Sequence, residues 1–164
     1  MLSEIQNFNL PAFYEIPDIG LFLEQTTKYI SEYLSPLDGM ALTGSMISNY
    51  VKKKIIASPV KKQYSREQIA YLFFIAVAKT VLSLEDIQLL MELQKKTYTC
   101  EKAYEYFRRE LKDTLLYVFG GKEHMDEMSS AKNMEEKTLL RNTVIAVSHK
   151  VFLDKYFKQM REAE

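Results

Sequence analysis

The residue types with the clearest chemical potential lie in segment 43–66, which holds six basic side chains and no acidic one. Its first part is rich in small polar side chains. Such side chains at the start of a helix can reach base edges, and basic side chains beside them can neutralise phosphates. The segment therefore predicts a surface that reads duplex DNA. The residues expected to contact DNA are Thr43, Ser45, Ser48, Asn49, Lys52, Lys53, Lys61, Lys62, Tyr64 and Arg66.

The distribution of charge is more informative than its total. The chain has 22 basic and 22 acidic residues, and a formal net charge of zero argues against a protein that binds nucleic acid through overall charge. Outside 43–66, however, 16 basic residues face 22 acidic ones. This asymmetry favours one anion-binding face. The simpler interpretation, that the lysines are only solvated, stays open.

A helix over 43–54 and a wing over 55–64 are the elements that would position these side chains. The hydroxyl of Thr43 can cap the first turn of such a helix. The stretch IIASPVKKQY suits two short strands, with Pro59 at the bend between them. We therefore predict a reader helix followed by a two-stranded wing.

The rest of the chain predicts an all-α protein, because apolar residues recur at helical spacing. Ser65 with Gln68 forms a capping-box pattern that opens one of these helices. Pro11 and Pro17 indicate an irregular N-terminal arm over 1–18, whose aromatic residues dock on the core. Further helices are expected over 19–34, 66–80, 84–96, 100–119 and 131–161.

A resemblance to known families lies in residues 42–90, which read LTGSMISNYVKKKIIASPVKKQYSREQIAYL and, further on, LSLEDIQLL. This pattern resembles the MerR-type winged helix-turn-helix. In that family two apolar residues, here Ile55 and Ile56, end the reader helix. A basic residue, here Lys62, stands two positions before a Tyr-Ser pair. More closely, LTxxMIxNYVK and KKxYSREQIAYL resemble an uncharacterised bacterial family, domain of unknown function 1836.

The MerR resemblance implies a DNA-binding transcriptional regulator with a winged helix-turn-helix-like region over 19–97. The helical region 98–164 would then serve dimerisation, effector sensing or both, and we expect it to pack as one unit with the rest. A homodimer through the C-terminal helices and a small-molecule effector are accordingly candidate partners. The alternative is a helical protein-interaction module that keeps the fold without binding DNA.

Other chemistry finds little support in the sequence. Cys100 lies 24 residues before His124, and a Cys–His pair is a weak catalytic candidate, so we expect no enzyme, cofactor or metal site. One cysteine and no signal-peptide pattern indicate a reducing cytoplasm, and no stretch is apolar enough for a membrane span. Aromatic residues before Gly120 are expected in the core or around an effector: Tyr98, Tyr104, Tyr106, Phe107, Tyr117 and Phe119.

Overall fold

The computed structural model describes residues 1–128 and 133–164, and the predicted all-α class is confirmed. Within these residues the only β-pairing consists of two isolated bridges. None of the described helices is both long and apolar enough to cross a membrane. The helices are α1 (Leu2–Asn7), the 3₁₀ helix η1 (Phe13–Glu15), α2 (Leu23–Leu34), α3 (Gly44–Lys52), α4 (Arg66–Ala78), α5 (Leu84–Lys95), α6 (Cys100–Val118) and α7 (Met134–Glu162).

Local capping explains where several helices begin. Thr43 Oγ1 accepts a hydrogen bond from the backbone N–H of Met46 at 3.1 Å, which confirms its predicted role as the cap of α3. Ser65 and Gln68 form the predicted capping box of α4. Each cap satisfies backbone donors that the first turn of a helix leaves without partners.

The N-terminal part of the chain differs from the prediction in two places. The helix expected over 19–34 begins only at Leu23, because Leu21 is extended and pairs with Tyr64. The expected irregular arm contains a helical turn at each of α1 and η1. The start expected at 131 for the last helix lies outside the described residues, and α7 is seen from Met134.

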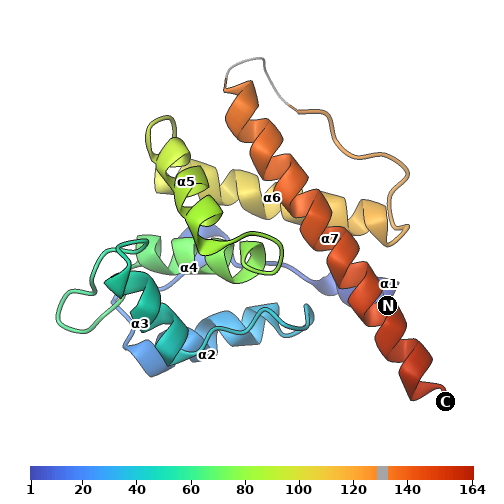
Figure 1. Ribbon diagram of the computed structural model, residues 1–164, viewed down its shortest axis with the longest axis horizontal. Helices are drawn as coiled ribbons and strands as arrows, with labels where there is room; N and C mark the ends of the chain where they lie inside the picture. The colour runs from blue at the N-terminus through green and yellow to red at the C-terminus, as the bar shows by residue number, and fades with distance from the viewer. Residues whose placement is uncertain (129–132) are drawn as a thin grey trace.

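Helix α4 lies in the middle of the fold and is buried on nearly all sides. It packs on α2, α6 and α7, and Figure 1 shows it between α2 and α5. Phe73 contacts Tyr29 of α2, and Phe74 packs edge-to-face on Phe107 of α6, with ring centroids 5.2 Å apart. Its buried residues are Ile69, Ala70, Leu72, Phe73, Ile75, Ala76, Val77 and Ala78.

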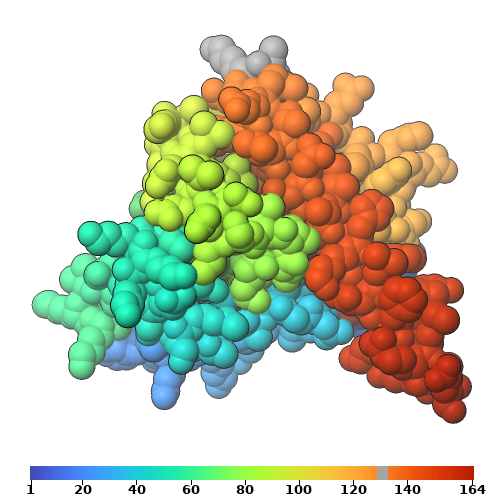
Figure 2. Space-filling view, in the orientation of Figure 1, coloured from blue at the N-terminus to red at the C-terminus, as the bar shows by residue number. Residues whose placement is uncertain are grey.

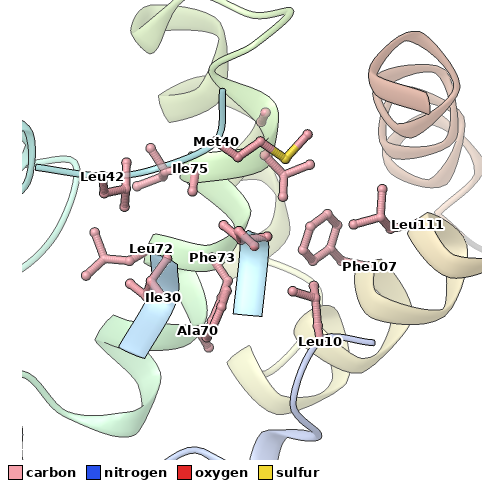
Figure 3. Close-up of a cluster of buried hydrophobic side chains, with 14 of the residues drawn as sticks. Leu10, Ile30, Met40, Leu42, Ala70, Leu72, Phe73, Ile75, Phe107 and Leu111 are labelled. Atoms are coloured by element: carbon pink, nitrogen blue, oxygen red, sulfur yellow. The ribbon is translucent and has the colours of Figure 1, made fainter. Parts of the chain in front are cut away.

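One core joins the N-terminal arm to both halves of the chain. Figure 3 shows Leu10 of the arm, Met40 of the linker after α2, and Phe107 of α6 gathered around α4. The predicted docking of the arm is confirmed for Phe8 and Phe13, whereas Tyr14 stays 67% exposed. The fold therefore places the segment 43–66 on a scaffold to which the whole chain contributes.

We predict that Phe73→Ala lowers the free energy of unfolding by about 3–5 kcal/mol, because it opens a cavity in a fully buried part of the core. Leu89→Ala on α5 is the control, since Leu89 is 64% exposed and its truncation should change stability by less than about 0.5 kcal/mol. Urea unfolding followed by circular dichroism measures both. Equal losses in the two variants would contradict the central role of α4.

Candidate nucleic-acid interface

Helix α3 turns its apolar side inward and its polar side outward. Ile47 and Tyr50 are buried against the core, and burial raises the pKa of the Tyr50 hydroxyl. Three of the predicted reader residues, Thr43, Ser45 and Ser48, are exposed. Asn49 is partly exposed. The helix thus presents small polar side chains along its outer face, and its first turn contains no acidic residue.

The end of α3 is fixed by an unusual backbone. Lys54 has a φ of +60°, in the left-handed region where glycine is the usual residue. The N–H of Ile55 then donates to the carbonyl of Tyr50 at 2.9 Å, which closes the helix. Ile55 and Ile56 are buried, as apolar residues following such an end often are. The helix expected to reach residue 54 therefore ends at Lys52.

A tight turn replaces most of the expected wing. Val60 and Gln63 form a single antiparallel bridge, with reciprocal backbone N–O distances of 3.2 and 2.9 Å. Lys61 and Lys62 occupy the two central positions, with φ of +51° and +65°. The bend is therefore at these lysines, and placing it at Pro59 was wrong. A two-stranded wing over 55–64 is not confirmed, because the pairing is limited to this one bridge.

Residues of the first turn of α4 hold this loop in place. Gln68 Nε2 donates to the carbonyls of Ala57 at 2.9 Å and Ser58 at 3.2 Å, while its Oε1 accepts from the N–H of Ser65. Beyond the turn, the backbones of Leu21 and Tyr64 exchange two hydrogen bonds. The loop that carries Lys61 and Lys62 is thus anchored at both ends.

Two residues expected to contact DNA are engaged elsewhere. Tyr64 is only 3% exposed, and its burial raises the pKa of the hydroxyl. Its side chain belongs to the hydrophobic core, so the prediction that Tyr64 contacts DNA was wrong. Arg66 donates to the carbonyl of Ile16 at 2.8 Å, stacks over the ring of Tyr14 and lies 3.8 Å from Asp18. Because it fastens the arm to α4, Arg66 is a structural residue here.

The lysines of the segment remain exposed. Among the residues that the structure describes, none of the five makes an ion pair with a carboxylate. They begin at the last residue of α3 and continue into the loop that projects at the left edge of the molecule (Figure 1). This loop also forms the left extremity of the surface in Figure 2. The set, here called the lysine face, comprises Lys52, Lys53, Lys54, Lys61 and Lys62.

An exposed apolar pair beside the lysine face was missed by sequence reasoning. Ile19 is 84% exposed and Val60 is 74% exposed, and both line the groove that contains Lys61. Gly20 lets the two segments approach, since it has a φ of +82° and an added Cβ would lie 2.9 Å from Gln63. The feature of the sequence that could have indicated this close approach is Gly20, which lies within an apolar run just before α2.

A family model described as domain of unknown function (DUF1836) matches residues 11–107. The chain belongs to this family. The match covers all of the lysine face and ends inside α6. No curated protein and no solved structure matches the chain. The matched segment therefore runs from Pro11, within the N-terminal arm, to Phe107 of α6.

The single cysteine of this family member, Cys100, begins α6, and its thiol lies 3.8 Å from the carbonyl of Glu67 on α4. Burial, and then the negative charge of Glu67, raise the pKa of the Cys100 thiol to about 12. The thiol is accordingly protonated at neutral pH, whereas a nucleophilic cysteine reacts as the thiolate. His124 and His149 are both exposed.

We predict that the double substitution Lys61→Asn with Lys62→Gly stabilises the protein by about 1–2 kcal/mol. Asn-Gly is the preferred pair for a turn with two positive φ values, and lysine is strained there. Denaturant unfolding measures the gain. Lys61→Gln with Lys62→Gln is the matched control, since it removes the same two charges and leaves a side chain at both positive φ values. A gain of equal size in the control would show that charge removal, and not relief of strain, is responsible.

Proposed function

We propose that the protein binds duplex DNA through the outer face of α3 and the lysine face, and that it acts as a transcriptional regulator. The observation that carries this proposal is the set of five exposed lysines that make no ion pair with a carboxylate in the described part of the chain. They begin at the last residue of a helix that has an exposed row of small polar side chains. Lysines contact phosphates and set the position of a protein on DNA, while small polar side chains read bases.

Backbone strain at the lysines supports a functional role for them. Lys54, Lys61 and Lys62 all have positive φ, a conformation that costs a residue with a side chain about 1 kcal/mol or more. Glycine or asparagine would relieve the cost at each position. If these lysine side chains were only solvated, no favourable interaction would offset the strain of the backbone at these positions.

The start of α3 offers a further attraction for an anion. Its first turn holds no acidic residue, and the helix dipole leaves partial positive charge at that end. Ser45 and Ser48 can therefore approach a polyanion without like-charge repulsion. Together with the fixed loop, this arrangement supports the proposal, with a single bridge where the MerR resemblance implies a two-stranded wing.

The second candidate function is a protein-interaction module without DNA binding. The exposed Ile19 and Val60 favour it, because apolar side chains beside lysines also suit an acidic, partly apolar protein segment. The two functions differ in what happens on titration with DNA. A module of this kind should leave duplex DNA unbound even at low salt.

We predict that Lys52→Glu with Lys62→Glu abolishes binding to duplex DNA in gel-shift assays on genomic fragments, while circular dichroism stays unchanged. Each neutralised phosphate releases counterions, so five lysines give a slope of log affinity against log salt of about −4 to −5. Lys102→Glu on α6 is the control. Wild-type protein that fails to shift any fragment at low salt would refute DNA binding.

We also propose a homodimer formed through α7, since one recognition unit offers few base contacts and such proteins usually bind paired half-sites. Helix α7 has 29 residues, and its inner side packs into the core through Val144, Val147 and Val151. On its outer side an exposed apolar row recurs every seven residues, as one of the two seam positions does in the heptad repeat of paired helices. The row consists of Leu139, Ala146, Leu153 and Met160.

We predict a sedimentation mass of about twice the chain's 19.2 kDa for the wild-type protein at micromolar concentration. Leu153→Glu should return it to the monomer mass, because a charge in the seam must be desolvated without a partner. Leu89→Glu, at an exposed leucine of α5, should remain a dimer. A monomer mass for the wild-type protein, unchanged by added DNA, would rule the dimer out.

A further inference from the structure

A partly open cavity of about 70 Å³ lies between α4, α5, α6 and α7. The lining is mainly hydrocarbon and aromatic, so water would find few partners in it. Its apolar wall is formed by Ala70, Phe74, Leu90, Met91, Ala103 and Phe107, with Leu140 at its edge.

The polar side chains at the cavity already have partners within the protein. Tyr71 donates its hydroxyl proton to Gln94 Oε1 at 3.0 Å, and Gln94 Nε2 donates to the carbonyl of Tyr98 at 2.8 Å. The Cys100 thiol lies 3.8 Å from the carbonyl of Glu67. An occupant of the cavity is therefore not needed to satisfy any of these groups.

The remaining polar residues of the lining are engaged in the same way. Tyr104 donates its hydroxyl to the carbonyl of Pro11 at 2.7 Å. The buried carboxylate of Glu136 accepts a hydrogen bond from the Thr97 hydroxyl, and it also faces a neighbouring polar pocket lined by Arg109 and Lys137. A cationic ligand is not required to balance its charge.

We propose that this cavity is a binding site for a small, neutral, apolar molecule no larger than a single aromatic ring. Apolar cavities of about 150 Å³ stay dry and bind benzene. The present cavity is about half that size. Met91 forms part of the wall, and its unbranched side chain can adjust to admit a ring. The edge-to-face pair of Phe74 and Phe107 offers ring edges and faces to an aromatic guest.

The cavity is connected to the lysine face through α4. Tyr71 lines both this cavity and the groove that contains Lys61. Gln68, which holds the loop at Ala57 and Ser58, lies one turn earlier on the same helix. A ligand that shifts Tyr71 would therefore act on the loop. An effect on DNA affinity rests on the proposed function, whereas binding of the ligand does not.

The test is a titration of the isotope-labelled full chain with benzene, followed by amide NMR in the absence of DNA. Saturable shifts should appear at the residues that line the cavity. Ala103→Leu fills the cavity and should weaken benzene binding at least tenfold, whereas Ala163→Leu, at the exposed end of α7, should leave it unchanged. If Ala103→Leu fails to fold, the smaller Ala103→Val serves the same purpose.

Met91→Ala enlarges the cavity and should increase affinity for indole, a two-ring probe, at least tenfold over the wild type. The proposal is overturned if benzene causes no saturable shifts at the lining residues. It is also overturned if the cavity-filling variants bind benzene as well as the wild type does. Because no DNA is present, a failure here is separate from a failure of DNA binding.

Discussion

The structure depends on the burial of α4 on nearly all of its sides. A helix that is apolar around its circumference cannot stay at a surface, so other elements must enclose it. The arm, α2, α6 and α7 supply that enclosure, and the pair of Phe74 and Phe107 joins the two halves of the chain. This explains why the family match runs past residue 97 into α6, since the region 19–97 alone would leave Phe74 uncovered.

The same helix sets the geometry of the lysine face. Its start carries Ser65, Arg66 and Gln68, and the last two each perform a local task together with a distant one. Gln68 completes the capping box and holds the carbonyl of Ala57. Arg66 begins the helix and binds the arm at the carbonyl of Ile16. The position of the loop after α3 thus follows from the burial of α4.

Local features of the fold could be predicted from the sequence, and long-range ones could not. The caps at Thr43 and Ser65 depend on residues within one turn, so their types reveal them. The pairing of Leu21 with Tyr64 spans more than forty residues and leaves no periodic signal. Residue type and position predict DNA contacts for Tyr64 and Arg66. In the structure Tyr64 is buried, and Arg66 donates to the carbonyl of Ile16 in the arm. The exposure of Ser45 and Ser48 on α3 was predicted correctly from helical spacing alone.

Charge on the lysine face is not compensated by carboxylates of the residues that the structure describes. Several charges elsewhere are paired, as in Arg141 with Glu110, at 3.0 Å, and Lys155 with Glu4, also at 3.0 Å. Among the described residues of segment 43–66, the ion pair is that of Arg66 with Asp18, and it serves the arm. The like charges of the lysine face repel one another, and Gln68 and the Leu21 bridge hold part of the backbone that carries them. An anionic partner of the kind proposed above would reduce that repulsion.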